Sequence, residues 1–117
     1  LKTMGKDFIQ LTGNDDNALE FNKRGGVGSI SVTANIAAKL CSDFQIACID
    51  NLENAIKLDK VLQPLHSAMF IESNPSPVKY AASLLGMCKP FVRLPLVEIK
   101  DETKKQVSEA LKVAKLL

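Results

Sequence analysis

Aromatic residues are scarce in this sequence of 117 residues, which has no tryptophan, one tyrosine and five phenylalanines. Neither charge sign dominates, because fifteen Lys and Arg stand against thirteen Asp and Glu and leave a net charge of +2. A protein that binds nucleic acid normally concentrates basic residues on one face and stacks bases on aromatic rings. The interleaved charges and the few rings therefore argue against nucleic acid as a partner.

The sequence also lacks a hydrophobic run long enough to span a bilayer, which argues against a membrane protein. Its apolar content of 46% is ample for a core and argues against disorder. A typical domain holds about 100–150 residues, so one compact domain is the upper limit. The first residues, Leu1-Lys2-Thr3-Met4, have neither an initiator methionine nor the apolar core of a signal peptide. We therefore expect the sequence to begin inside a longer gene product.

Cysteines are few, and the spacing of Cys41, Cys48 and Cys88 matches no zinc motif. On one helix, Cys41 and Cys48 would share a face two turns apart, which is too far for a disulfide. We therefore expect no metal site and three buried or half-buried thiols in a reducing cytoplasm.

The first third of the sequence alternates between strand and helix signals. Residues 8–12, which are mostly apolar, and the β-branched run at residues 29–33 predict two strands. Asp15 or Asp16 is placed to cap a short helix between them, over residues 18–24. Strand, helix and strand together predict a βαβ unit with two parallel neighbouring strands.

The remaining sequence has helical periodicity. Asn35 is placed to cap the first helix, Pro64 should bend the second, and Gly86 should end the third. The expected helices cover residues 36–48, 52–71, 77–85 and 101–115, with an extended connector at residues 87–99. Two parallel strands followed by four helices would leave both sheet edges open, so they do not make a self-sufficient α/β domain.

Several residues suggest chemistry when taken singly. The glycines at residues 25–28 precede a strand rather than a helix, so a turn is a better interpretation than a phosphate cradle. Asp15 and Asp16 could act as acid and base or bind a metal, but a helix cap in a solvated turn fits better. We interpret His66, the only histidine, as structural, and Tyr80 as a packing residue.

Two stretches of the sequence carry a recognisable pattern. They comprise residues 11–16 with 25–35, which include Ile30-Ser31-Val32-Thr33-Ala34-Asn35, and residues 72–79 with Arg93-Leu94-Pro95-Leu96. Together they resemble the C-terminal part of the dihydrodipicolinate synthase family of bacterial lysine biosynthesis. The related N-acetylneuraminate lyases favour Ser-Thr-Tyr-Asn where this sequence has Val-Thr-Ala-Asn, so the synthases are preferred.

The resemblance implies an α/β fold, the C-terminal fragment of a (β/α)8 TIM barrel with a C-terminal helical domain. Residues 1–35 would be a partial barrel that resembles the last two strands, and residues 36–117 the barrel-closing helix and the helical domain. A whole barrel needs about 250 residues, so the sequence resembles the last two-fifths of such an enzyme.

The family's activity implies pyruvate and aspartate semialdehyde as substrates and requires no cofactor. A lysine of the sixth barrel strand forms a Schiff base with pyruvate, and the resulting enamine attacks the aldehyde. That lysine and the allosteric lysine-binding site would lie upstream of Leu1, so we expect these 117 residues to be inactive alone. The alternative is a non-catalytic truncated subunit or assembly module.

Two residues match substrate-binding positions of the family. Gly13 corresponds to a glycine whose carbonyl faces the substrate, and Ile30 to an isoleucine that lines the pyruvate pocket. Glu20, Lys23 and Arg24 fall on a helix that joins dimers into tetramers, which implies a homo-oligomer. Lys79 lies in the helical appendage rather than on a barrel strand, so we do not expect it to be the nucleophile.

Overall fold

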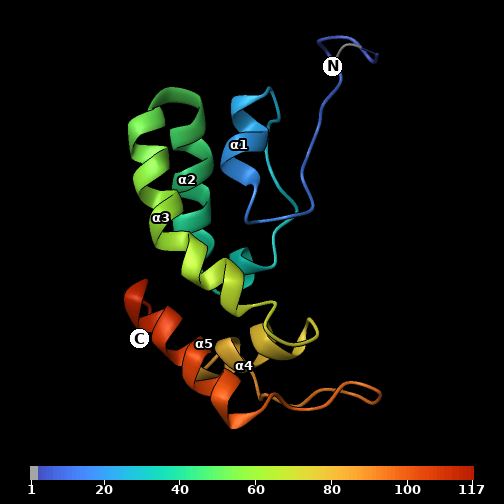
Figure 1. The fold of residues 1–117 in the computed structure, drawn as a ribbon, viewed down its shortest axis with the longest axis vertical. Coiled ribbons are helices and arrows are strands. Elements are labelled where there is room, and N and C mark those ends of the chain that lie inside the picture. Colours follow the sequence, from blue (N-terminus) through green and yellow to red (C-terminus); the bar gives the residue numbers. More distant parts are fainter. Residues whose placement is uncertain (1–2) are drawn as a thin grey trace.

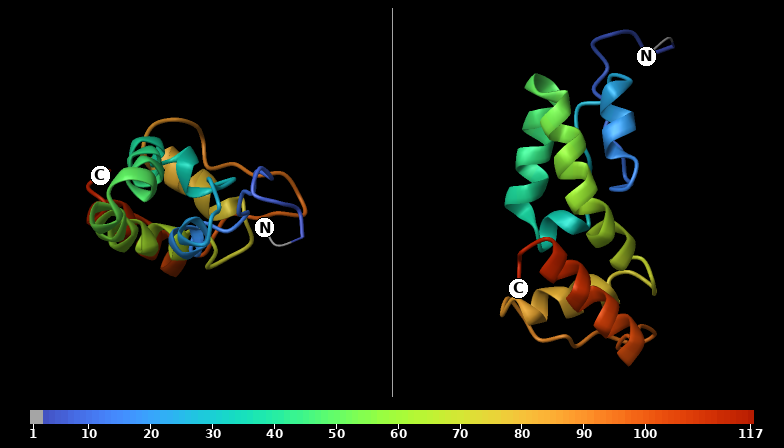
Figure 2. Two further views of the ribbon diagram at one scale, coloured as in Figure 1. Left: turned by 90° about the horizontal axis from the view of Figure 1, so that it is seen from above. Right: turned by 60° about the vertical axis from the view of Figure 1, so that its left-hand side comes forward.

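The computed structural model describes residues 3–117, and these residues form an elongated helical body of 45 × 30 × 21 Å. Helices α2 and α3 form its long axis, α1 lies beside them, and α4 and α5 lie across the lower end (Figure 1, Figure 2). The elements are α1 (Ala18–Lys23), the 3-10 helix η1 (Thr33–Asn35), α2 (Ala38–Asp50), α3 (Leu52–Ala68), α4 (Ser76–Leu84) and α5 (Asp101–Val113).

The two predicted strands are wrong as regular elements, because the described residues contain only one isolated parallel bridge, between Thr12 and Ser29. The two segments are neighbours and run parallel, as predicted. Three backbone hydrogen bonds join them, from Val27 N–H to Gln10 O (3.0 Å), from Thr12 N–H to Gly28 O (3.0 Å) and from Ile30 N–H to Thr12 O (2.8 Å). We call these paired residues, 10–12 and 27–30, the short ladder.

The short ladder stays short for two physical reasons. Each segment has a single partner among the described residues, and a lone pair of strands is only marginally stable in water. The backbone also turns helical at Val32, with φ −75° and ψ −46°, so residues 32 and 33 leave the extended conformation. The expectation that the first segment is buried is wrong. Ile9 is 74% exposed, because no described element packs over it.

The turn after α1 is confirmed at Gly25 and Gly26. Gly25 has φ +100°, a conformation that a side chain disfavours. A Cβ atom at Gly26 would overlap the ring of Phe21, so the close return of the chain also requires glycine there. The turn brings the second segment of the short ladder back beside the first.

Polar side chains tie α1 to α2 and to the short ladder. The amide nitrogen of Asn22 donates to Gln45 Oε1 at 2.8 Å, and the amide nitrogen of Gln45 donates to Ser29 Oγ at 3.2 Å. The prediction that Asn35 caps the helix expected at residues 36–48 is wrong. Helix α2 begins after Ala37 and has no side-chain cap. Asn35 instead donates its side-chain N–H to the carbonyl of Val32, because η1 occupies the predicted start of the helix.

Helices α2 and α3 form an antiparallel pair joined by one residue, Asn51, whose side chain accepts the Asn54 N–H at 3.0 Å. Their interface holds much of the core, including Phe44, Ala47, Ala55, Leu62 and Leu65. Helix α3 contains Pro64 and ends at Ala68 rather than at residue 71. Its axis turns toward its C-terminal end, as the proline predicts (Figure 1).

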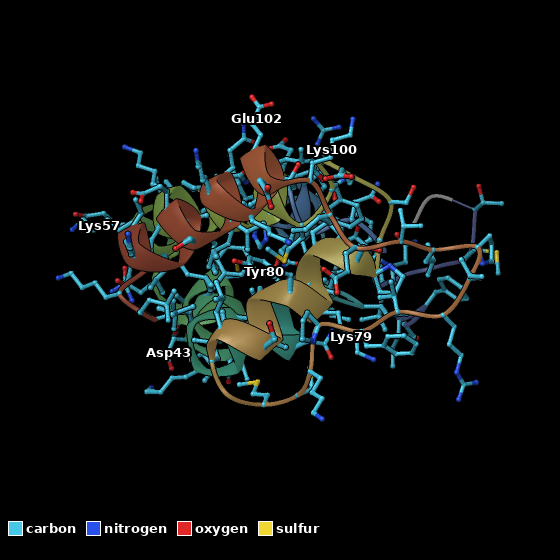
Figure 3. The ribbon with its side chains drawn as sticks, turned by 90° about the horizontal axis from the view of Figure 1, so that it is seen from below. Asp43, Lys57, Lys79, Tyr80, Lys100 and Glu102 are labelled. Atoms are coloured by element: carbon cyan, nitrogen blue, oxygen red, sulfur yellow. The ribbon has the colours of Figure 1, made fainter. Side chains whose placement is uncertain are left out.

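Helices α4 and α5 pack against each other and close the lower end of the body. Helix α4 stops just before Gly86, as predicted, and α5 ends at Val113, two residues before the predicted end. Tyr80 packs against the core and has Lys104 Nζ 5.9 Å from its ring centroid, which confirms the packing interpretation (Figure 3). The Glu72 carboxylate, in the loop before α4, accepts the Lys100 N–H at 2.9 Å.

Candidate substrate-binding site

Gly13 and Ile30 lie next to each other at the same end of the short ladder. Gly13 follows Thr12 directly, and the Thr12 carbonyl accepts the Ile30 N–H. Ile30 is 71% exposed, and a Cβ atom built on Gly13 would meet nothing within 4 Å. The structure thus places both residues at the C-terminal ends of parallel segments, on a surface that a ligand can approach.

The loop that carries Gly13 is closed by its own side chains. Thr12 Oγ1 donates to Asn17 Oδ1 at 2.8 Å and accepts the Asn14 N–H at 3.1 Å. Thr12 is buried and its partners Asn14 and Asn17 are exposed, so these part-buried bonds close the loop around Gly13 at its surface.

Asp15 does not cap the helix that follows it, which corrects the prediction. Helix α1 begins after Asn17 and has no side-chain cap. Asp15 is only 5% exposed, and its Oδ2 accepts the N–H groups of Val32 at 2.9 Å and Thr33 at 3.1 Å. Its carboxylate therefore caps η1, seventeen residues away along the chain, and not α1. Asp16 remains exposed, as expected for a solvated turn.

Helix α3 contacts η1 through one side chain and the Gly13 loop through another. Thr33 Oγ1 and His66 Nδ1 form a buried hydrogen bond of 2.7 Å, and Gln63 Nε2 donates to the Asp16 carbonyl at 2.9 Å. Burial lowers the pKa of His66, and three nearby carboxylates oppose that shift less strongly. His66 is therefore neutral at pH 7, which fits its structural interpretation.

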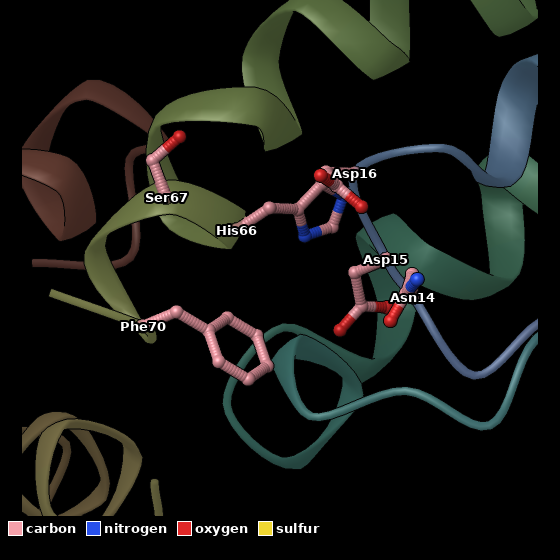
Figure 4. Close-up of a pocket in the computed structure, with 6 residues that line it drawn as sticks. All are labelled: Asn14, Asp15, Asp16, His66, Ser67 and Phe70. Carbon is pink, nitrogen blue, oxygen red and sulfur yellow. The ribbon is translucent and has the colours of Figure 1, made fainter. Parts of the chain in front are cut away.

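A cavity of about 250 Å³ lies between residues 14–16, which follow Gly13, and the C-terminal end of α3; neither Gly13 nor Ile30 lines it. Figure 4 shows the His66 ring reaching from α3 toward the loop that carries Asp15 and Asp16. The cavity is lined by Asn14, Asp15, Asp16, His66, Ser67 and Phe70. Sequence reasoning missed this group, because no local pattern connects residues 14–16 with residues 66–70. The position of Asp15 just after a predicted strand was the one available signal.

The site offers binding groups but no nucleophile among the described residues. Lys79 lies exposed on α4, at the opposite end of the body from the N-terminal segment (Figure 1, Figure 3). Burial, aided by the charge of Asp15, raises the pKa of the nearby Cys41 thiol to about 11, so this thiol stays protonated and unreactive. Burial also raises the pKa of Cys48. Cys88 is exposed, contrary to the expectation of a buried or half-buried thiol.

Residues 3–117 contain no group of three His, Cys, Asp or Glu side chains arranged to hold a metal ion. None of the helices in this part of the chain combines the length and the apolarity needed to cross a bilayer.

Comparisons with known proteins place these features in a family. The 4-hydroxy-tetrahydrodipicolinate synthase of Pelagibacter ubique (strain HTCC1062) is 73% identical over an alignment of 118 positions, gaps included. The alignment covers 97% of this chain and 40% of the relative. The dihydrodipicolinate synthase structure from Thermotoga maritima matches with a TM-score of 0.94 and 37% identity, over 99% of this chain and 40% of that one.

A third match is the chloride-inhibited dihydrodipicolinate synthase from Acinetobacter baumannii complexed with pyruvate, with a TM-score of 0.89 and 35% identity. It covers 94% of this chain and 38% of that one. The chain therefore spans about 40% of the length of the relatives that it matches. Residues 1–114 match the Dihydrodipicolinate synthetase family, and the chain belongs to that family.

Proposed function

We propose that these residues are the C-terminal part of a 4-hydroxy-tetrahydrodipicolinate synthase. This lyase condenses pyruvate with aspartate semialdehyde through a Schiff base, without a cofactor, in the cytoplasmic synthesis of diaminopimelate and lysine. The observation that carries the proposal is that Gly13 and Ile30 lie at the same end of the short ladder, where the Ile30 N–H bonds to the carbonyl of Thr12, the residue before Gly13. The 73% identity to a synthase over nearly the whole chain supports it.

In this proposal, residues 1–35 supply the last two strands of a (β/α)8 barrel, and residues 36–117 supply the closing helix and the helical domain. The exposed apolar side chains along the first segment support this division, because an adjoining part of a barrel would cover them. They are Phe8, Ile9 and Leu11. The partner at this edge is then the N-terminal part of the barrel.

The chemistry assigned to this chain is binding and orientation. The Gly13 carbonyl faces the substrate as an acceptor, and the Ile30 side chain forms an apolar wall of the pyruvate pocket. The Schiff-base lysine comes from the N-terminal part, since no lysine lies at the site among the described residues. The complete enzyme is a homo-oligomer with α1 at an interface. Within this helical segment, Glu20 pairs with Lys23 at 3.2 Å and with Arg24 at 2.8 Å.

Borohydride trapping tests the proposal on two polypeptides. The first is residues 1–117 alone, and the second is a chimera in which these residues replace the matching segment of the Pelagibacter ubique synthase. With pyruvate and borohydride, mass spectrometry should find one pyruvyl adduct per chimera chain and none on residues 1–117 alone. The chimera should also condense pyruvate with aspartate semialdehyde.

Two outcomes would contradict the proposal. An adduct on Lys79 or on another lysine of residues 1–117 would place the nucleophile in this segment. A folded chimera that traps pyruvate but does not condense it would favour the alternative, in which the segment is a non-catalytic assembly module.

A further inference from the structure

We propose that Asp15 is a positioning residue for pyruvate binding, because its carboxylate fixes Gly13 relative to Ile30. This inference rests on the proposed function, in which these two residues form part of the pyruvate pocket. Asp15 itself contacts the backbone beyond Ile30, so it acts through the two residues rather than on the substrate.

The argument starts from where the short ladder ends. Its last backbone bond joins the Ile30 N–H to the Thr12 carbonyl, and beyond it the two segments are no longer paired by their main chains. The next connection is the side chain of Asp15, which accepts the N–H groups of Val32 and Thr33. Asp15 lies two residues after Gly13, and Val32 lies two residues after Ile30. The carboxylate therefore continues the connection between the two segments just beyond the two residues that are proposed to contact pyruvate.

The turn that Asp15 holds is anchored from a second side. The Thr33 hydroxyl bonds to His66 on α3, and Ser31 Oγ accepts the Ala34 N–H at 2.9 Å within the turn. Thr33 and His66 are both buried. The position of Ile30 is thus determined by the Gly13 loop on one side and by helix α3 on the other.

Only an acceptor of the right length can perform this role. A single oxygen of Asp15 receives both N–H groups, so the amide oxygen of asparagine can replace it. Alanine would leave the N–H groups of Val32 and Thr33 without a partner, and an unsatisfied buried donor is costly. The turn would then move to recover those bonds, and Ile30 would move with it.

The test uses the chimera with Asp15→Ala and Asp15→Asn. Asp15→Ala should raise the KM for pyruvate about tenfold and leave kcat and the KM for aspartate semialdehyde within about twofold, because the lost interaction acts on binding of the first substrate. Asp15→Asn should recover a pyruvate KM within about threefold of the parent. Asp43→Ala is the matched control: it also removes a carboxylate with two hydrogen bonds, from Lys39 on α2, and should leave the pyruvate KM unchanged.

Amide hydrogen exchange, measured on the same proteins, tests the hydrogen bonds from Val32 and Thr33 to Asp15 without any need for turnover. The amides of Val32 and Thr33 should exchange faster in Asp15→Ala than in Asp15→Asn. If Asp15→Ala does not fold, Asp15→Glu replaces it, because the added methylene displaces the carboxylate while keeping its charge.

Each negative result has a distinct meaning. An inactive parent chimera counts against the proposed function. In that case the exchange rates still show whether Asp15 holds the N–H groups of Val32 and Thr33. An active parent with an unchanged pyruvate KM in Asp15→Ala overturns the positioning role. Equal damage from the alanine and asparagine variants also overturns it, because the charge and not the acceptor would then be what matters.

Discussion

The side chain of Ile30 is large, apolar and mostly exposed at the end of the short ladder. An exposed isoleucine contributes little to folding, since most of its surface is not removed from water. In the proposed function, its value in this position comes from the pyruvate that binds against it. This distinction between packing and binding is measurable.

Replacing Ile30 with alanine in the chimera should separate the two roles. The loss of stability should fall well below the roughly 2–5 kcal/mol typical of isoleucine truncation in a core. The pyruvate KM should rise, because part of the pocket wall is gone. Thermal melting and steady-state kinetics measure the pair, with Ile46→Ala, at an exposed position on α2, as the control. A large fall in melting temperature with normal pyruvate kinetics would place Ile30 in the core and remove it from the site.

Single residues also show which contacts of this site could be predicted from the sequence and which could not. Gly13 and Ile30 were predictable as neighbours, because parallel segments bring their C-terminal ends to the same edge. The role of Asp15 was not, since an aspartate just before a short helix normally caps that helix. Its true partners are the first residue of η1 and the residue before it, where a continuing strand was expected. Nor does any sequence spacing connect Thr33 with His66.

At the scale of elements, the helices were predictable and the strands were not. Apolar periodicity within one segment placed α2, α3, α4 and α5 to within about three residues of their observed ends, because a helix satisfies its hydrogen bonds internally. A strand depends on neighbours that lie elsewhere in the sequence. The segments at residues 10–12 and 27–30 accordingly keep the predicted direction and neighbour but not the predicted length.

Helix α5 depends on a carboxylate outside the helix. Glu72 accepts the N–H of Lys100 at the helix start, and the Thr103 hydroxyl lies beside it as a second donor. The bond to Thr103, followed by the bond to the Lys100 backbone, lowers the pKa of Glu72 below 4.5. Because the folded-state pKa is the lower one, ionised Glu72 stabilises the folded state above pH 4.5. That contribution declines as the pH falls through the folded-state value.

The chimera with Glu72→Ala should therefore melt at a lower temperature than the parent at pH 7. The difference should shrink as the pH falls below 4.5, where the parent also loses its charge at this position. Melting curves across that range measure it, and Asp7→Ala, at an exposed position, controls for the loss of a carboxylate. A difference that widens toward acid pH would contradict the assigned sign.

At the scale of the whole molecule, the N-terminal side of the body combines two features that favour association. Residues 8–30 expose several large apolar side chains, and these side chains lie next to the open edges of the short ladder. Exposed edges and apolar patches promote association with other chains. The sequence indicated this feature, because two strands cannot cover their own faces.

A polypeptide of residues 1–117 made alone should consequently self-associate. Sedimentation velocity over rising concentrations should show a weight-average mass that increases beyond the 12.7 kDa of one chain. Adding the N-terminal part of the Pelagibacter ubique synthase should replace that self-association with a defined complex. A strictly monomeric polypeptide at high concentration would contradict the prediction.

The single residue between α2 and α3 restricts how this segment can vary in length. Asn51 ends one helix and caps the next, so an inserted residue has no loop to occupy and would extend one of the two helices. Each added helical residue rotates the rest of its helix by about 100°, which would turn the apolar stripe of α3 away from α2. The mostly exposed stretch between α4 and α5 carries no such constraint. Insertions and deletions should therefore be excluded at Asn51 and tolerated along the exposed residues 87–89, before the Arg93-Leu94-Pro95-Leu96 stretch.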